Sequence, residues 1–182
     1  MKKHQVRSTI LTLLAAGAVV ISPALAASYV QDSDHISQLL SDAKTQTFQL
    51  REDASTMESY TRSNLSWESH AAAVNGMKEH INEAGRTLAK LDEARKTASP
   101  WQATAIDRIK PLLKEIASNT ETVIEYINKN PKRLFMNQYK DYIEANADVA
   151  DKLAGLIADF VEYGNTKNRL ERLSSKLELP GR

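Results

Sequence analysis

The sequence contains no cysteine, and only 6 glycine and 5 proline residues among its 182. The absence of cysteine excludes disulfides, covalently attached haem, thiolate zinc sites, iron–sulfur clusters and a cysteine nucleophile. So few turn-forming residues argue against a β-sandwich or a β-barrel. Neither sign of charge dominates, because 24 basic residues face 23 acidic ones. The 42% of apolar residues excludes a disordered chain and fits one domain with its own hydrophobic core.

The first 26 residues resemble an export signal. A basic start precedes an uncharged, mostly apolar run at residues 10–21, and small residues flank Leu25 at a signal-peptidase site. We therefore predict cleavage after Ala26 and a periplasmic or secreted location for residues 27–182. The alternative is an uncleaved membrane anchor, but an apolar run of 12 residues is shorter than the roughly 20 that span a bilayer.

Cleavage would remove three basic residues and no acidic residue, so the net charge would change from +1 to −2. Such a charge gives no electrostatic reason to expect a nucleic-acid partner or adhesion to anionic membranes. Because no second long apolar run follows, we expect residues 27–182 to form one soluble domain without membrane contact.

Four long stretches place apolar residues at steps of three and four, which is typical of helices with one buried face. The predicted helices cover residues 34–62, 66–96 and 100–129, and a fourth apolar stripe from Tyr139 to Tyr163. Short connections between them make neighbouring helices antiparallel. The fold class predicted is therefore all-α: an up-down-up-down four-helix bundle whose helices are about 45 Å long.

Several residues predict where these helices begin and end. Asp32 or Ser33, Ser66 and Ser99 can each accept hydrogen bonds from the free N–H groups of a first turn. Pro111 lies inside the third apolar pattern, which resumes in phase beyond it, so a kink is expected there rather than an end. Gly164 is a plausible stop for the fourth helix. Residues 166–178 then either continue that helix or form a short separate one.

No motif of a known catalytic class is present: the sequence lacks Gly-x-Ser-x-Gly, a phosphate-binding glycine loop and His-Glu-x-x-His. We therefore expect neither an enzyme nor a metal site. His70 is the one histidine on an inward stripe, and it is expected to bond a carbonyl or a tyrosine at the edge of the core. The alternative is an axial ligand for non-covalent haem, or a proton acceptor in a pocket. His35 and His80 are expected to be solvated.

Pairing the predicted helices as hairpins brings most aromatic residues to one end of the bundle. Rings with hydroxyl tips around a histidine can form a ligand pocket with large apolar faces and a few directed polar groups. The candidate ligand-binding residues are Tyr60, Trp67, His70, Tyr126, Tyr139 and Tyr142, with Met57, Phe135 and Met136 nearby. The alternative is that the tyrosines simply fill the end of the bundle. The opposite end is expected to be mainly aliphatic, with Trp101 exposed.

Polar residues on or beside the apolar stripes suggest two further features. Asn119 and Asn146 are expected near one level, where a buried amide pair would fix the register of the helices. Carboxylates recur along the fourth helix at Asp141, Glu144 and Asp148, and continue at Asp151. A straight helix cannot wrap six or more oxygens around calcium, so this row is expected to be a solvated face.

The sequence therefore favours a non-enzymatic, exported helical bundle that binds an unknown protein partner or a small ligand and needs no cofactor. The alternative is a bundle that carries a small ligand or non-covalent haem at its aromatic end. A third possibility is an enzyme whose site is assembled from scattered residues.

Overall fold

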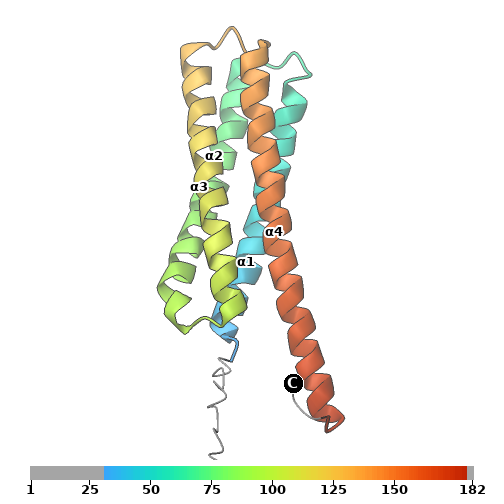
Figure 1. Cartoon of the computed structure of the whole chain (residues 1–182). Coiled ribbons are helices and arrows are strands. Elements are labelled where there is room, and N and C mark those ends of the chain that lie inside the picture. The colour runs from blue at the N-terminus through green and yellow to red at the C-terminus, as the bar shows by residue number, and fades with distance from the viewer. Residues whose placement is uncertain (1–30, 180–182) are drawn as a thin grey trace, which may run out of the picture.

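The computed structural model describes residues 31–179, so the expected export signal lies outside the described residues. Within this range the chain is all-helical and contains no strand. Its four long helices confirm the all-α class and are consistent with a four-helix bundle (Figure 1). The elements are α1 (Asp34–Tyr60), α2 (Trp67–Ala94), the short 3₁₀ turn η1 (Arg95–Thr97), α3 (Pro100–Lys129) and α4 (Asn137–Lys176).

Successive helices run in opposite directions, and α1 also packs along α4, which closes the four helices around one core (Figure 1). The connections at residues 61–66 and 130–136 lie at the same end, which we call the loop end. The start of α1 and the connection at residues 95–99 lie at the other end, which we call the opposite end. No helix of the described residues is long and apolar enough to cross a membrane.

The helix starts follow from local capping, as the sequence predicts. The Ser33 hydroxyl accepts a hydrogen bond from the backbone N–H of Ile36, and the Ser66 hydroxyl accepts one from Ser69. At the start of α3, Ser99 is the cap residue and Pro100 the first helical residue, where a missing N–H has no cost. The pattern beyond Pro111 also continues as expected, because α3 runs unbroken to Lys129.

The core is formed by one face of each helix and runs the length of the bundle. Leucine, isoleucine and methionine side chains fill most of it, in keeping with the threes-and-fours spacing of the sequence. The largest fully buried side chains are Tyr139, Ile36, Leu40, Leu50, Met57, Met77, Leu91, Ile106, Ile116, Ile127, Ile143 and Leu153. Burial of these groups supplies the main stabilisation of a fold that has no disulfide.

The expected stop at Gly164 is wrong, because α4 continues without a break to Lys176 and includes most of residues 166–178. Gly164 is buried, and a Cβ atom placed on it would lie 2.8 Å from Cη2 of Trp101. The glycine therefore allows the indole ring to approach the α4 backbone closely, and it does not end the helix.

This close approach predicts opposite effects for two glycines of α4. Gly155→Ala is expected to raise the free energy of unfolding by about 0.5–1 kcal/mol, because Gly155 is exposed and nothing lies within 4 Å of its added Cβ. Gly164→Ala gains the same helix propensity but must displace Trp101, so a net loss of about 1 kcal/mol is expected. Urea denaturation measures both; equal stabilisation by the two variants would show that the indole moves freely.

Candidate functional site

Five of the six predicted site residues lie in contact at the loop end. Their rings form a continuous chain, with centroid distances of 5.6 Å from Tyr60 to His70, 5.4 Å from His70 to Tyr139, 5.5 Å from Tyr139 to Tyr126 and 5.8 Å from Tyr126 to Tyr142. We call these five residues the ring chain. All four long helices contribute at least one ring, so the ring chain joins them at this level.

His70 is the buried centre of the ring chain. It lies in the first turn of α2, is 2% exposed, and its Nδ1 is hydrogen-bonded to the Tyr139 hydroxyl at 2.9 Å. This tyrosine partner is one of the two partners that the sequence suggested. Burial lowers the pKa of His70 and raises the pKa of Tyr139. Both groups are therefore neutral at neutral pH, and the bond between them is a neutral hydrogen bond.

The depressed pKa of His70 predicts that stability falls in mild acid. The unfolded histidine, with a pKa near 6.5, binds its proton before the folded one does, so the free energy of unfolding decreases as the pH falls below about 6.5. One such group gives a slope of at most about 1.4 kcal/mol per pH unit.

The measurement is chemical denaturation between pH 7.5 and 5. His70→Gln should flatten the acid slope, whereas the matched change at the exposed His35 should leave it unchanged. An unchanged slope in His70→Gln would assign the acid sensitivity to other groups.

The exposures of Trp67 and Trp101 are the reverse of those that the sequence suggests. Trp67 is 45% exposed and lies outside the ring chain, because it is the first residue of α2 and His70, one turn later, takes the inward position. Trp101, expected to be exposed, is half-buried: its Nε1–H donates to Asp32 at 2.8 Å and its ring packs edge-on against Tyr163. The expected order of exposure of the two indoles is therefore wrong.

Four large apolar side chains are exposed at the loop end. Leu65 is 43% exposed and Trp67 45% on one connection, and Phe135 is 70% exposed and Met136 46% on the other. We call these four residues the loop-end patch. They lie on the two connections that share one end of the bundle, and exposed apolar groups at one end of a domain often mark interaction sites.

A shallow depression of about 350 Å³ lies beside the loop-end patch, between the end of α3 and the start of α4. Tyr126 is the only member of the ring chain that reaches it, and its hydroxyl donates to the backbone carbonyl of Arg133 at 3.3 Å. The lining residues are Tyr126, Asn130, Arg133, Phe135, Met136, Asn137 and Gln138. The depression therefore combines aromatic faces with amide and guanidinium donors.

The geometry of His70 does not favour haem ligation. Its ring contacts Tyr60 and Tyr139 edge-to-face on either side and is 2% exposed, so an iron atom would reach it only after the ring chain opened.

Within residues 31–179 no three His, Asp or Glu side chains lie close enough together to hold a metal ion. The carboxylate row Asp141, Glu144, Asp148 and Asp151 is exposed on α4. Of the other histidines, His35 is exposed, whereas His80 is half-buried and paired with Asp53.

The buried amide has a different partner from the one expected. Asn146 is 1% exposed, and its Nδ2 donates to Oγ1 of Thr120 at 3.1 Å and approaches Sδ of Met77 at 3.8 Å. Asn119 is half-buried and takes no part in this cluster. The expected Asn119–Asn146 pair is wrong because the inward face of α3 at this level passes through the next residue, Thr120.

The opposite end carries a polar cluster that the sequence analysis missed. Gln102 is fully buried: its Oε1 accepts from the backbone N–H of Ser33 at 3.0 Å and of Ser99 at 3.1 Å, and its Nε2 donates to the carbonyl of Ser33 and the hydroxyl of Ser37. Asp32, beside it, bonds Trp101 and Lys167. The expectation of mainly aliphatic packing at this end is therefore wrong.

The charge of Asp32 is stabilised where it lies. Burial opposes its ionisation, but the hydrogen bonds from Lys167 and Trp101 and the charge of Lys167 outweigh burial and lower its pKa. The Lys167 ammonium lies 2.7 Å from the Asp32 carboxylate, whose side chain is 8% exposed. This ion pair ties the start of α1 to α4, a structural role with no unfilled position for a ligand.

Protein-family models, curated proteins and solved structures contain no significant match to this chain.

Proposed function

We propose that this protein is an exported, non-catalytic helical bundle that binds a protein partner through its loop end. The observation that supports the proposal best is the loop-end patch, whose most exposed member is Phe135 at 70%. Tryptophan, phenylalanine and methionine are enriched at protein interfaces, where they supply large contact areas. A partner that covered the patch would remove this apolar surface from water.

The base of the patch is preorganised for such contact. Trp67 is the first residue of α2, and Met136 directly precedes α4; the first turns of these helices supply His70 and Tyr139 to the ring chain. Because the ring chain fixes these helix ends, little backbone freedom is lost when a partner binds. Arg133 and Lys132 at the edge supply the polar rim that specific interfaces usually have.

Export is part of the proposal and is supported by the order of basic, apolar and small residues at residues 1–26. The protein recovered from its native source is expected to begin at Ala27 and to lie in the soluble extracytoplasmic fraction. Intact-mass measurement checks this. A chain that retained Met1 and sedimented with membranes would identify the segment as an anchor instead.

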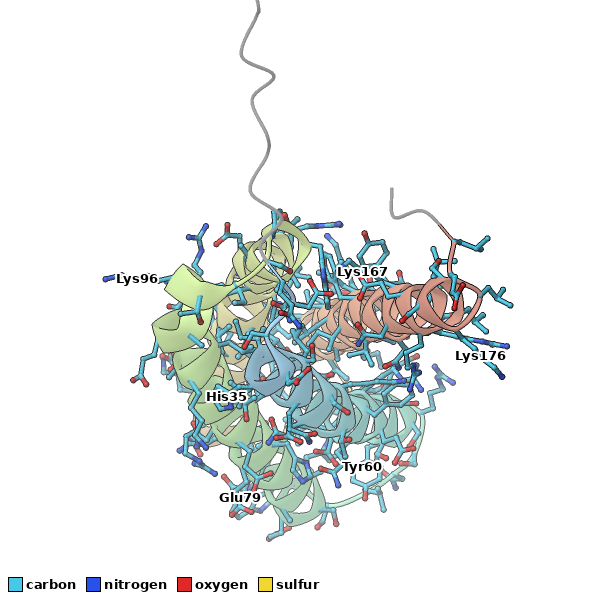
Figure 2. The ribbon with its side chains drawn as sticks, turned by 90° about the horizontal axis from the view of Figure 1, so that it is seen from below. His35, Tyr60, Glu79, Lys96, Lys167 and Lys176 are labelled. Atoms are coloured by element: carbon cyan, nitrogen blue, oxygen red, sulfur yellow. The ribbon has the colours of Figure 1, made fainter. Side chains whose placement is uncertain are left out.

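Site-specific photocrosslinking tests the binding proposal. A benzophenone amino acid at Phe135 should give a discrete crosslinked protein in the native extracytoplasmic extract, and the same group at the exposed Glu79, on the side of the bundle (Figure 2), should not. Phe135→Ser combined with Met136→Ser should abolish co-purification of that protein without changing the circular dichroism spectrum. Crosslinks of equal strength from both positions, or from neither, would contradict the proposal.

The alternative is a small ligand, and the depression beside the patch is the observation that favours it. Its aromatic and amide lining suits a molecule with an apolar ring and a few hydrogen-bonding groups. Small molecules extracted from the native protein should then raise the melting temperature of the wild type but not of Arg133→Ala. A native protein that releases no small molecule on denaturation would contradict the small-ligand alternative, and only the protein-partner proposal would remain.

A further inference from the structure

The last turns of α4 project beyond the rest of the bundle. Lys167 lies at the level of Asp32, just before the start of α1, so the part of α4 after Lys167 extends past the opposite end (Figure 1). In the view along the bundle, Lys167 lies close to the other helices and Lys176 lies well outside them (Figure 2). We call residues 168–179 the overhang. Of its four leucines, Leu170, Leu173 and Leu177 recur at steps of three and four and are 61%, 45% and 62% exposed.

The exposed leucines continue a row that α3 covers higher up. Tyr142, Tyr163, Leu170 and Leu177 are separated by multiples of seven residues, the repeat of helices packed along one another. Tyr142 contacts Tyr126 and Tyr163 contacts Trp101, and both of these partners belong to α3. The first residues of α3, which begins at Pro100, lie beside Tyr163. No part of α3 therefore reaches Leu170 or Leu177, and both leucines are exposed.

A basic row runs beside the leucines. Arg169, Arg172 and Lys176 have the same spacing as the three leucines; Arg169 stands four residues before Leu173 and Lys176 three residues after it, so the two rows are neighbours on the helix surface. All three are exposed, and none forms an ion pair with a described residue. The nearby Glu171 is already paired with Lys167 at 3.1 Å. The overhang therefore presents apolar side chains with positive charge along one flank.

We propose that the overhang docks an acidic amphipathic helix of a partner protein. The partner helix would lie along α4 in the place that a longer α3 would occupy. Its leucine-type side chains would pack on Leu170, Leu173 and Leu177, and its carboxylates would pair with the basic row. This surface is separate from the loop-end patch and lies at the other end of the bundle.

The charges disfavour two other occupants. A second copy packed antiparallel would place one basic row against the other, and a parallel copy would place Arg169 opposite Ser174 rather than a carboxylate. An anionic lipid surface lying along the overhang would also meet its exposed carboxylates, Glu171 and Glu178, which repel it.

Fluorescence anisotropy with synthetic peptides tests the proposal on the chain from Ala27 to Arg182. The probe is a three-heptad helical peptide with leucine at positions a and d and glutamate at the flanking positions. Its control has lysine in place of every glutamate. The variants are Leu170→Ser with Leu173→Ser, and Arg169→Glu with Arg172→Glu. The matched controls are Phe135→Ser on the loop-end patch and Lys90→Glu on an exposed face of α2.

The glutamate peptide is expected to bind at least tenfold more tightly than the lysine peptide. The double leucine variant should weaken binding at least tenfold, the charge-reversal variant should invert the preference, and both controls should bind as the wild type does. Equal binding of the two peptides, or binding that survives the leucine variant, would overturn the proposal. So would flotation with phosphatidylglycerol-containing vesicles in place of peptide binding, or dimerisation that the leucine variant abolishes. Because Phe135→Ser tests the loop-end patch alone, failure of either surface leaves the other assessable.

Discussion

Leu153→Ala is expected to lower the free energy of unfolding by about 2–5 kcal/mol. Leu153 lies in the middle of α4 and is 0% exposed, so its side chain is surrounded by the other helices. The substitution removes the transfer free energy of the lost methyl and methylene groups and leaves a cavity that the packed helices close only in part. Among single truncations in this chain it should be one of the most destabilising.

The matched control is Leu170→Ala on the same helix. Leu170 is 61% exposed, and its replacement is expected to change the free energy of unfolding by less than about 0.5 kcal/mol. Urea denaturation followed by circular dichroism compares the two variants at one protein concentration. Equal losses in both would mean that the overhang is buried in solution, for example against a second copy, and would contradict the fold described for α4.

Local signals in the sequence were sufficient to predict most of the fold. Caps at Ser33, Ser66 and Ser99 set the helix starts, and the threes-and-fours spacing identified the inward faces. Both signals depend on interactions within about one turn of helix, which a single sequence displays directly. The same spacing correctly carried α3 through Pro111, because one missing N–H does not change which residues face the core.

Contacts between non-consecutive helices could not be predicted in this way. Hairpin pairing relates each helix only to its neighbours in the chain. The bonds Asp32–Trp101, Ser33–Gln102 and His70–Tyr139 instead join helices that run in the same direction, two places apart in the chain. The register between the two hairpins sets these contacts, and it depends on the packing of the whole core. For this reason the sequence does not predict the polar contacts at the opposite end.

Two expectations are wrong because of the local role that one residue plays. Glycine near the end of a helical pattern commonly marks its end, but Gly164 is needed where the ring of Trp101 meets the α4 backbone. Gln102 stands three residues after the cap Ser99, which is the position of a capping-box residue. That spacing was visible in the sequence and would have indicated a polar start for α3.

The candidate site was predicted in part. Tyr60, His70, Tyr126, Tyr139 and Tyr142 do come together, because they lie on inward faces or beside the connections that the hairpin pairing places at one end. That they bind a ligand stays a prediction. Exposure of side chains next to a connection depends on the path of the connection, which helical periodicity does not describe. The loop-end patch, with Phe135 outermost, therefore became visible only in the structure.

The buried amide of Gln102 provides the second large effect. Gln102→Ala is expected to lower the free energy of unfolding by about 3 kcal/mol, because two backbone N–H groups, those of Ser33 and Ser99, lose their acceptor at once. Each donor left unsatisfied in a buried position costs about 1–3 kcal/mol, and the cavity adds to this loss. The start of α1 also loses the bond from Nε2 to the carbonyl of Ser33.

A shape-matched variant separates hydrogen bonding from packing. Gln102→Met retains most of the side-chain volume and none of the four hydrogen bonds, so it is expected to lose nearly as much stability as Gln102→Ala. Gln49→Ala, at an exposed position of α1, should change the free energy of unfolding by less than about 0.5 kcal/mol. Hydrogen exchange should show faster exchange at the Ser33 and Ser99 amides in both Gln102 variants and unchanged exchange at His70. If Gln102→Met were as stable as the wild type, the bonds would contribute little, and Gln102 would act mainly by filling space between α1 and α3.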